Sequence, residues 1–478
     1  MGIKHKEQDM SVCVRQTPKR DFTKGRVLKN LILFSIPMAI ATLLQVLFNA
    51  ADVAIVGRFA GHTYQAAVGG TSSTVHLIVN LFIGVSIGVN VAMANAFGAK
   101  DEARQYRIVH SAMALALVSG IVVLIIGVAF SRYILQAIDV PPDVIRLSTL
   151  YLRIYFLGAP AIMIYNFGAS LLRAVGETKK PLYYLLVAGV LNVVINVVTV
   201  VFLDMHVVGV GLGTVISQYV SAVWVVVDLI RAKGTVKYTV KKTRFYKAEV
   251  KNMLFIGIPS GISSCLFSLS NVLLQAQVNQ FGSVALAGRS VGASIDTFCD
   301  AVASSVEKGV VTFVGQNVGA NKRDRINRIV GAGLLACACI QLVYGMGMLL
   351  FGEYVCGLYN QDPAVIEEAM KWVMYISATQ AIMSVMYVFG ATLRGMGYSV
   401  FPMLINLFFI CCVRLGYVWV IYPLFSVQTI EKIYLIYPIT WVLSGGVQSI
   451  AYYCIRRAEK RRKQEQDKTL KEENVATA

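Results

Sequence analysis

The sequence predicts an all-α membrane protein with twelve transmembrane helices arranged in two six-helix lobes. Three features predict this fold: the composition, the number of long apolar runs and an internal repeat. Of the 478 residues, 56% are hydrophobic and 15% are charged, and the mean hydropathy is +0.63. Soluble domains carry about 25% charged residues, so the composition excludes a soluble globular enzyme.

Twelve apolar runs are long enough to cross a membrane, because ~30 Å of hydrocarbon takes about 20 residues at helical rise. Six of the runs lie in each half of the chain. In order, the predicted spans are residues 28–57, 64–97, 105–130, 144–170, 181–203, 208–231, 250–280, 285–318, 327–351, 365–392, 399–424 and 430–456. Several exceed the minimum length, which predicts helices that tilt, bend or extend beyond the bilayer.

The basic residues lie mainly on one side of these spans. The N-terminal segment, the C-terminal tail and the even-numbered connections hold 35 of the 44 lysines and arginines. Because positive charge accumulates in cytoplasmic loops, we expect a multi-pass membrane protein with both termini in the cytoplasm. The net charge of +18 is therefore a signal of topology, and no nucleic-acid partner is expected. The predicted parts are a cytoplasmic N-terminal segment (1–27), an N-lobe (28–231), a cytoplasmic linker (232–249), a C-lobe (250–456) and a cytoplasmic tail (457–478).

The second half of the chain repeats the first. An offset of 221 residues aligns Gly98 with Gly319, and an offset of 222 aligns Pro37 with Pro259. Six spans is an even number, so both halves insert in the same orientation. This is a parallel repeat, related by a pseudo-two-fold axis along the membrane normal. Two such lobes enclose a cleft that opens to either side in turn when the lobes rock.

Polar side chains at membrane depth mark a candidate site in the N-lobe. Asp52 lies 15 residues past Pro37, about 22 Å at helical rise, and hence in the outer half of the first span. Asn192 and Asn196 are four residues apart on the fifth span, and Thr214 lies near the outer end of the sixth. One carboxylate with amide and hydroxyl oxygens at a common depth favours a hard-cation site, or an aspartate that takes a proton. A satisfied polar core that holds the lobe together is the alternative.

The eighth span carries Asp296, Asp300 and Glu307 on one helical face. Glu307 and Arg414 each lie 12 residues, or about 18 Å, from the cytoplasmic ends of their helices. At equal depth the two are expected to form an ion pair inside the C-lobe, with a structural role favoured over a transport role. Whether the three carboxylates take part in transport is left open.

Several further residues are candidates for lining the cleft between the lobes. For those on the tenth span ordinary helix packing is the favoured alternative, and for the histidine a hydrogen-bonded core position. The candidates are Gln45, Asn49, His76, Met383, Met386 and Tyr387. The nine cysteines show no spacing typical of a disulfide framework or a zinc site, so no cofactor is expected besides a coupling ion.

Four local motifs lie at or just beyond the ends of predicted spans. They are Asn49-Ala-Ala-Asp-Val-Ala-Ile-Val-Gly57-Arg58, Leu172-Arg-x-x-Gly176, Phe313-Val-Gly-Gln-Asn-Val-Gly319 and Leu393-Arg-Gly-Met-Gly397. These motifs resemble those of the multidrug and toxic compound extrusion (MATE) transporters. With the twelve spans and the repeat, the chain resembles this family over nearly its whole length. The resemblance implies a secondary active exporter of organic cations and amphipathic drugs in the bacterial plasma (inner) membrane, driven by inward Na⁺ or H⁺.

The resemblance also implies roles for particular residues. In the bacterial branch with an N-lobe cation site, that site uses an Asp on the first helix, an Asn and an Asp four apart on the fifth, and a Thr on the sixth. Asp52, Asn192 and Thr214 match this pattern, whereas Asn196 departs from it, because better-known members have an Asp there. We assign cation coupling to these four residues, with Na⁺ as their ligand if the protein is sodium-coupled. Pro37 matches the proline whose helix bends during transport.

Two other functions remain alternatives. A lipid-linked saccharide flippase of the same wider superfamily is the nearer one, but the intramembrane charges here are mixed rather than strongly cationic. A membrane-embedded enzyme is disfavoured, because H-E-x-x-H does not occur in the sequence. The expected partners are small cationic or amphipathic molecules and membrane lipid, and the protein is expected to be a monomer.

Overall fold

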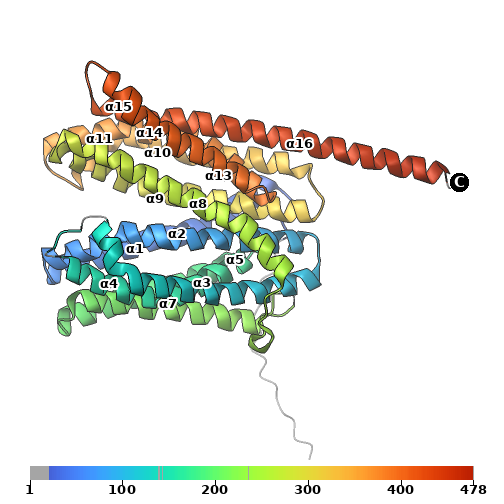
Figure 1. Ribbon diagram of the computed structural model, residues 1–478, viewed down its shortest axis with the longest axis horizontal. Helices are drawn as coiled ribbons and strands as arrows, with labels where there is room; N and C mark the ends of the chain where they lie inside the picture. Colours follow the sequence, from blue (N-terminus) through green and yellow to red (C-terminus); the bar gives the residue numbers. More distant parts are fainter. Residues whose placement is uncertain (1–20, 138–139, 143, 235, 477–478) are drawn as a thin grey trace, which may run out of the picture.

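The computed structural model describes residues 21–137, 140–142, 144–234 and 236–476. Within these ranges the chain is helical and contains no β-strand. Figure 1 shows two layers of roughly parallel helices, with α1 to α7 in the lower layer and the helices from α8 onward in the upper one. The two layers correspond to the predicted N-lobe and C-lobe.

The N-lobe consists of long apolar helices packed around a core rich in valine, alanine and leucine. Its elements are α1 (Val27–Phe59), α2 (His62–Gly98), α3 (Glu102–Ala137), α4 (Ile145–Leu157), α5 (Ala159–Ala174), α6 (Lys179–Val197), the π-helical turn η1 (Val198–Phe202) and α7 (His206–Arg231). Helices α4 and α5 meet at Gly158 with a bend of 45°. Together they form the broken span that corresponds to predicted residues 144–170.

The C-lobe follows a linker that contains one short turn, η2 (Val240–Lys242). Its tenth and eleventh spans are interrupted by short π and 3₁₀ turns, and its twelfth by a turn at Leu435. The elements are α8 (Lys247–Val278), η3 (Asn279–Phe281), α9 (Ser283–Gly319), α10 (Arg325–Gly357), α11 (Pro363–Tyr375), η4 (Ser377–Thr379), α12 (Gln380–Gly395), α13 (Val400–Asn406), η5 (Leu407–Val413), α14 (Arg414–Gly416), η6 (Tyr417–Ile421), η7 (Tyr422–Leu424), α15 (Ile430–Tyr434) and α16 (Ile436–Ala476).

Each predicted span corresponds to a helix or to a contiguous run of helices. Among the described residues, 10 helices are long and apolar enough to cross a membrane, and the bent pair of α4 and α5 makes an eleventh span. Helix α9 is the twelfth. It has 37 residues, but its hydropathy is lowered by charged side chains, which are Arg289, Asp296, Asp300, Glu307 and Lys308.

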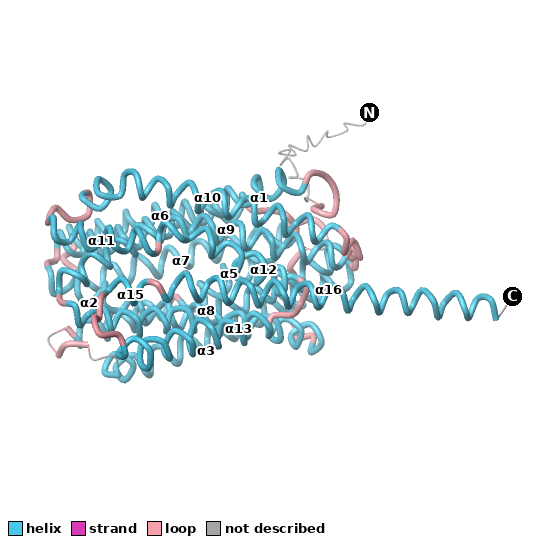
Figure 2. Tube along the Cα trace, turned by 90° about the horizontal axis from the view of Figure 1, so that it is seen from above, coloured by secondary structure: helices cyan, strands magenta, loops and turns pink. Residues whose placement is uncertain are grey.

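The last helix does not end at residue 456, the predicted boundary of the C-lobe. Instead α16 continues to Ala476, because the predicted tail is rich in strong helix formers, and Arg456 pairs with Glu459 one turn later at 3.0 Å. Figure 2 shows α16 projecting past one end of the bundle. We call this the basal end; it is formed by the starts of α1 and α8 and by the ends of α2 and α9.

At the basal end the two lobes meet through glycines at equivalent positions of the repeat. A Cβ atom added to Gly98 of α2 would lie 1.9 Å from the carbonyl oxygen of Gln316 on α9. One added to Gly319 of α9 would lie 1.9 Å from the carbonyl oxygen of Asn95 on α2. Any side chain would overlap the opposite backbone, so both crossings require glycine. The reciprocal contact is the geometry expected of a two-fold related pair.

The segment before α1 binds the C-lobe. The backbone nitrogen of Phe22 donates to Gln316 Oε1 at 2.9 Å, and the Phe22 ring stacks on Phe313 with centroids 4.0 Å apart. Lys322 Nζ donates to the carbonyl oxygen of Thr23 at 3.1 Å. The basal half of α1 continues this contact, since its buried apolar residues share one core cluster with α9 and α10.

The start of α8 binds the N-lobe in the corresponding way. Glu249 is buried and forms ion pairs with Arg104 and Arg107 of α3, at 3.3 and 3.4 Å. Met253, one turn further along α8, belongs to the N-lobe core. The linker is therefore fixed to the N-lobe at the point where the C-lobe begins.

Candidate functional site

Three helices bring the predicted N-lobe residues together. Helix α1 crosses α6 closely, because a Cβ added to Gly189 would lie 1.7 Å from the ring of Phe48. One turn beyond Phe48, Asp52 faces Asn192 and Asn196 of α6 and Thr214 of α7. Asp52 is 6% exposed, Asn192 5% and Asn196 0%. The three buried side chains and the half-buried Thr214 thus form one polar cluster.

Hydrogen bonds link Asp52 to both neighbouring helices. Asn196 Nδ2 donates to Asp52 Oδ1 at 2.5 Å, and Thr214 Oγ1 lies 3.4 Å from Asp52 Oδ2. With its amide in the alternative orientation, Asn192 donates to Asp52 Oδ1 at 2.9 Å and accepts from the backbone nitrogen of Thr214 at 3.2 Å. Asp52 is therefore an acceptor shared by α6 and α7.

The cluster is tightly enclosed. A Cβ added to Gly213 would lie 2.1 Å from Asn196 Oδ1, so α7 approaches α6 closely only because that residue is glycine. An apolar cluster that includes Val56, Tyr151 and Val210 packs nearby. Within the described residues no lysine or arginine forms an ion pair with Asp52. The carboxylate is held by neutral donors in an apolar surrounding.

The donor set fits a small hard cation. Such ions take oxygen ligands, and the cluster offers a carboxylate, two amide oxygens and a hydroxyl. Asn196 Oδ1 is buried and has no hydrogen-bond partner, which leaves one oxygen available to a ligand at the cost that burial of an unpaired acceptor carries. A proton on Asp52 would satisfy the same carboxylate without a metal ligand.

Pro37 is buried within a continuous α1. Proline has no N–H group, so the helix lacks one backbone hydrogen bond at this position and bends more easily there. The neighbouring Leu31, Phe34 and Ser35 contact Gly309 of α9. The proline therefore separates a basal part of α1 that is packed on the C-lobe from an outer part that carries Asp52.

The other candidates on α1 do not join the cluster. Gln45 and Asn49 are exposed, whereas Asp52 on the same stripe is buried. The predicted stripe is thus divided between an open surface and the interface with α6. His76 lies in α2, but its side chain lies outside the described residues.

The predicted ion pair of Glu307 with Arg414 is wrong. Glu307 forms its ion pair with Arg394, at the end of α12. Arg414 is fully buried; its Nε donates to Thr440 Oγ1 at 2.9 Å, and its guanidinium lies 4.5 Å from the ring centroid of Tyr437. Equal depth did not predict the pair, because depth along a helix does not determine the direction in which a side chain points.

Met383 and Met386 belong to the packed interior of the C-lobe, and the half-buried Tyr387 packs against it. Met383 is 6% and Met386 3% exposed. Both share an apolar cluster with Trp372 and Trp441, against which Tyr387 packs. The alternative of ordinary helix packing therefore holds for these three residues.

A polar network in the C-lobe was not anticipated. Asp296 Oδ1 accepts from Tyr344 at 2.5 Å and from Ser377 at 2.7 Å, and its Oδ2 accepts from Trp372 Nε1 at 2.7 Å. The signal in the sequence was the carboxylate itself, since a charged group at membrane depth needs partners. Its partners come from three other elements and share no motif.

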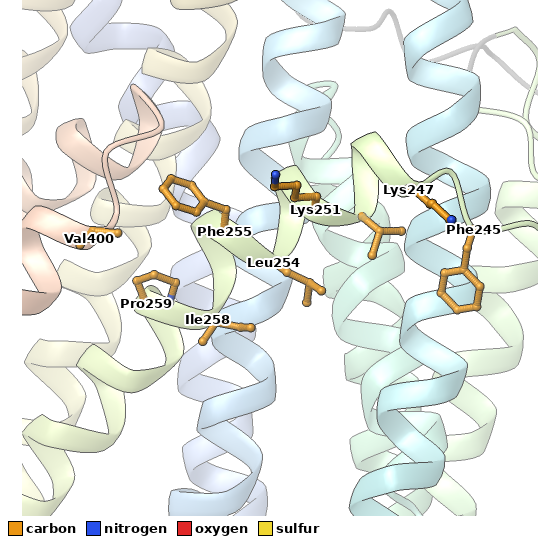
Figure 3. Close-up of a pocket in the computed structure, with 9 residues that line it drawn as sticks. Phe245, Lys247, Lys251, Leu254, Phe255, Ile258, Pro259 and Val400 are labelled. Atoms are coloured by element: carbon orange, nitrogen blue, oxygen red, sulfur yellow. The ribbon is translucent and has the colours of Figure 1, made fainter.

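An apolar groove lies on the basal half of α8 (Figure 3). Its lining includes Leu254, Phe255 and Ile258 of α8 and Val400 of α13, with Lys247 and Lys251 at the basal side. None of the N-lobe candidates lines it. The groove is therefore separate from the cation cluster.

The two packed lobes of apolar helices, with the polar cluster around the buried Asp52 in one of them, define a multi-pass membrane protein of the two-lobed transporter class. The sequence model of the MatE family matches residues 37–198 and again 259–420. The two matches are offset by 222 residues, as the internal repeat predicts. The chain belongs to this family, the MATE transporters.

Named relatives and solved structures agree with this assignment. The chain is 26% identical over 441 residues to "Probable multidrug resistance protein YoeA" of Bacillus subtilis, covering 88% of this chain and 95% of that protein. It is 23% identical over 376 residues to "Multidrug export protein MepA" of Staphylococcus aureus, covering 79% and 83%. A crystal structure of MATE in the bent conformation superposes with a TM-score of 0.86 at 19% identity, covering 92% of this chain and 98% of that one. An outward-facing MATE family transporter of the MOP superfamily gives the same TM-score, identity and coverage.

Proposed function

We propose that the protein is a secondary active multidrug efflux transporter. It exports organic cations or amphipathic drugs by alternating access, and inward movement of Na⁺ or H⁺ through the N-lobe cluster drives the export. The names of the relatives support the substrate class, since they are described as multidrug resistance and multidrug export proteins. The lobe arrangement supports the transport cycle, because a parallel repeat can rock about its shared interface.

The observation that carries the proposal is the buried Asp52 cluster. Asp52 lies on α1, beyond Pro37, and bonds to α6 and α7. A cation or proton that binds Asp52 competes with these bonds, and so changes how the outer half of α1 packs. Because the basal half of α1 is fixed to the C-lobe, the change at Asp52 is transmitted to the lobe interface through the helix that contains the proline.

We place the basal end in the cytoplasm of a bacterial cell, because most lysines and arginines flank the helices at this end. The described lobe contacts at Gly98, Gly319 and Phe22 lie at the basal end. This arrangement supports a state in which the cytoplasmic side is closed and the opposite side is accessible. Both lobes belong to one chain, so we propose that the monomer is the transporting unit.

The test is drug export in proteoliposomes that contain the purified protein. A fluorescent organic cation is followed while a Na⁺ gradient and a pH gradient are imposed separately. Wild-type protein is expected to respond to one of them, and Asp52→Asn to lose more than about 90% of this response. Asp204→Asn is the matched control, because the Asp204 side chain is 86% exposed.

Two results would contradict the proposal. Full gradient-driven export by Asp52→Asn would remove the cation cluster from the mechanism. Movement of a lipid-linked saccharide across the membrane, without export of any organic cation, would favour the flippase alternative.

A further inference from the structure

The open groove on the basal half of α8 has no part in the proposed transport mechanism. Its volume is about 650 Å³, within the range of ~300–1,000 Å³ that is typical of small-molecule sites. Three of the apolar side chains that line it are well exposed: Phe245 is 46%, Phe255 59% and Ile258 43% exposed. Large apolar side chains around an open hollow mark a site of contact with a membrane or an apolar ligand.

Two lysines lie at the basal end of the groove. Lys247 and Lys251 are four residues apart in the first two turns of α8, so they share a face of the helix. Both are exposed, and in the part of the chain that the structure describes neither forms an ion pair. Figure 3 shows them near the start of the helix, with Leu254, Phe255 and Ile258 further along it. The groove thus has a positively charged end and an apolar body.

The carboxylate between the two lysines does not neutralise them. Glu249 is 5% exposed and belongs to the other side of α8, where it pairs with Arg104 and Arg107 of α3 at 3.3 and 3.4 Å. Three more exposed basic residues precede α8; they are Lys241, Lys242 and Arg244. Like charges repel, so this end of the groove disfavours a cationic drug and favours an anionic group.

The length of the groove fits one leaflet of a bilayer. Lys247 and Pro259 are the first and last residues of α8 in the lining, and 12 residues span about 18 Å at helical rise. Half of the hydrocarbon thickness of a membrane is ~15 Å. Residues Lys247–Phe281 are apolar enough to cross a membrane, so the lysines lie at the headgroups and the groove continues among the acyl chains. Lysines at the end of a span extend their ammonium groups toward the headgroups in this way.

We propose that the groove binds one anionic phospholipid of the leaflet at the basal end. The phosphate lies between the ammonium groups of Lys247 and Lys251, and one acyl chain lies along the apolar side chains that follow them. A zwitterionic lipid fits the apolar part equally well, so the lysines determine the preference, by about fivefold each. The inference does not rest on drug export or on the Asp52 cluster, because it requires only that α8 crosses a membrane.

Lipid in the groove also contacts the point where α8 bends most easily. Pro259 lines the groove, and the helix lacks one backbone hydrogen bond there because proline has no N–H group. The acyl chain therefore packs against the bending point of the first C-lobe helix.

The test is quenching of tryptophan fluorescence by brominated lipids in proteoliposomes with the same lipids in both leaflets. Phe255→Trp places a reporter in the groove. Leu269→Trp places one at a position of α8 that is 45% exposed and lies in the opposite leaflet, 18 residues beyond Lys251. The signal of the four native tryptophans is subtracted by means of wild-type protein. Brominated phosphatidylglycerol should quench Phe255→Trp at a mole fraction at least fivefold lower than brominated phosphatidylcholine does, and the two lipids should quench Leu269→Trp equally.

Charge variants in the Phe255→Trp background separate a site from the general positive charge of the basal end. Lys247→Gln combined with Lys251→Gln should abolish the preference for phosphatidylglycerol. Lys29→Gln is the matched control, because Lys29 of α1 is equivalent to Lys251 with the offset of 222 residues and is also exposed; it should leave the preference unchanged. Glycerol phosphate, which has the charge but no acyl chain, should not relieve the quenching.

Four results overturn the proposal. Equal quenching of Phe255→Trp by both lipids shows that the groove does not select a headgroup. A preference that survives loss of both groove lysines, or that disappears in Lys29→Gln, assigns it to the surface as a whole. Relief by glycerol phosphate removes the acyl chain from recognition. Quenching of Leu269→Trp without quenching of Phe255→Trp shows that protein covers the groove. Each variant must elute from size exclusion as wild type does, and Ile258→Trp replaces Phe255→Trp if the latter does not.

Discussion

Gly98 and Gly319 are equivalent positions of the two repeats, and each lies against the backbone of the other's helix. A Cβ added to either would come within 1.9 Å of a carbonyl oxygen of the opposite lobe. The contact is reciprocal, so both glycines serve one closed arrangement of the lobes at the basal end. In any arrangement with the basal ends apart, the same substitutions meet no obstacle from this contact.

We expect Gly98→Ala and Gly319→Ala to favour the basally open state. Overpacking of this kind costs about 1–3 kcal/mol, which changes the ratio of two conformations by roughly 5- to 150-fold. Spin labels at the basal ends of α3 and α10 should show longer distances, and export should fall in parallel. Gly331→Ala is the control, because no atom lies within 4 Å of its added Cβ. Wild-type distance distributions in both variants would contradict this prediction.

Phe22→Ala should weaken the same closed state from the other side of the interface. Phe22 is 2% exposed and stacks on Phe313, so truncation removes contacts with the C-lobe that an open basal end would not make. A cysteine introduced near Phe313 is expected to react faster with a water-soluble maleimide in this variant. Phe351→Ala, at a position that is 64% exposed, should leave the rate unchanged. Equal labelling rates in wild type and Phe22→Ala would show that this contact does not hold the basal end closed.

Thr214 offers a test of the N-lobe cluster that keeps its charge. Thr214→Val preserves the shape but removes the hydroxyl that contacts Asp52 Oδ2, and Thr214→Ser keeps the hydroxyl. Loss of one hydrogen bond or ligand to a charged group is worth about 1.5–3 kcal/mol. The coupling-ion concentration that half-saturates export should therefore rise at least tenfold for Thr214→Val and stay near wild type for Thr214→Ser. If both variants behave alike, the hydroxyl has no part in ion binding.

Glu307 and Arg394 should behave as a coupled pair in stability measurements. Glu307→Gln leaves Arg394 without its counter-charge at a mostly buried position, which costs about 3–5 kcal/mol. Combination with Arg394→Met should recover most of this loss, as thermal unfolding of the detergent-solubilised protein would record. In a cycle of Glu307→Gln with Arg414→Met, the effects should add within about 0.5 kcal/mol. Strong coupling to position 414 would reinstate the pair that helix depth suggested.

Helical rise explains why the N-lobe cluster could be predicted. In a membrane helix, residue spacing fixes the depth of each side chain. The residues of the cluster lie at one depth on three helices that pack against one another; they are Asp52 on α1, Asn192 and Asn196 on α6, and Thr214 on α7. Depth alone did not predict the ion-pair partner of Glu307, because that partner also depends on how each helix is rotated about its axis. Arg394 also falls in the connection between the predicted spans 365–392 and 399–424, whereas the structure places it in the last turn of α12.

The contacts between the lobes could not be predicted for a different reason. Phe22 lies in a polar stretch that resembles a loose terminus, and nothing local links it to Phe313, which is far away in the sequence. Gln45 and Asn49 show the same limit, since the stripe they share with Asp52 does not reveal which neighbour covers it. For Phe22, Gln45 and Asn49, packing between segments that are far apart in the sequence determines whether the side chain is buried.

The anchoring of the two proline-containing helices has a consequence for motion. Phe22 and Thr23, just before α1, bind to the C-lobe, and Glu249 at the N-terminal end of α8 binds to the N-lobe. Each lobe therefore fixes the N-terminal end of the other lobe's first helix. The lobes cannot rotate as independent rigid bodies while both sets of contacts are intact. Each change between the two arrangements of the lobes then requires α1 to bend near Pro37 and α8 to bend near Pro259. A more rigid helix at either proline should therefore slow both directions of the change.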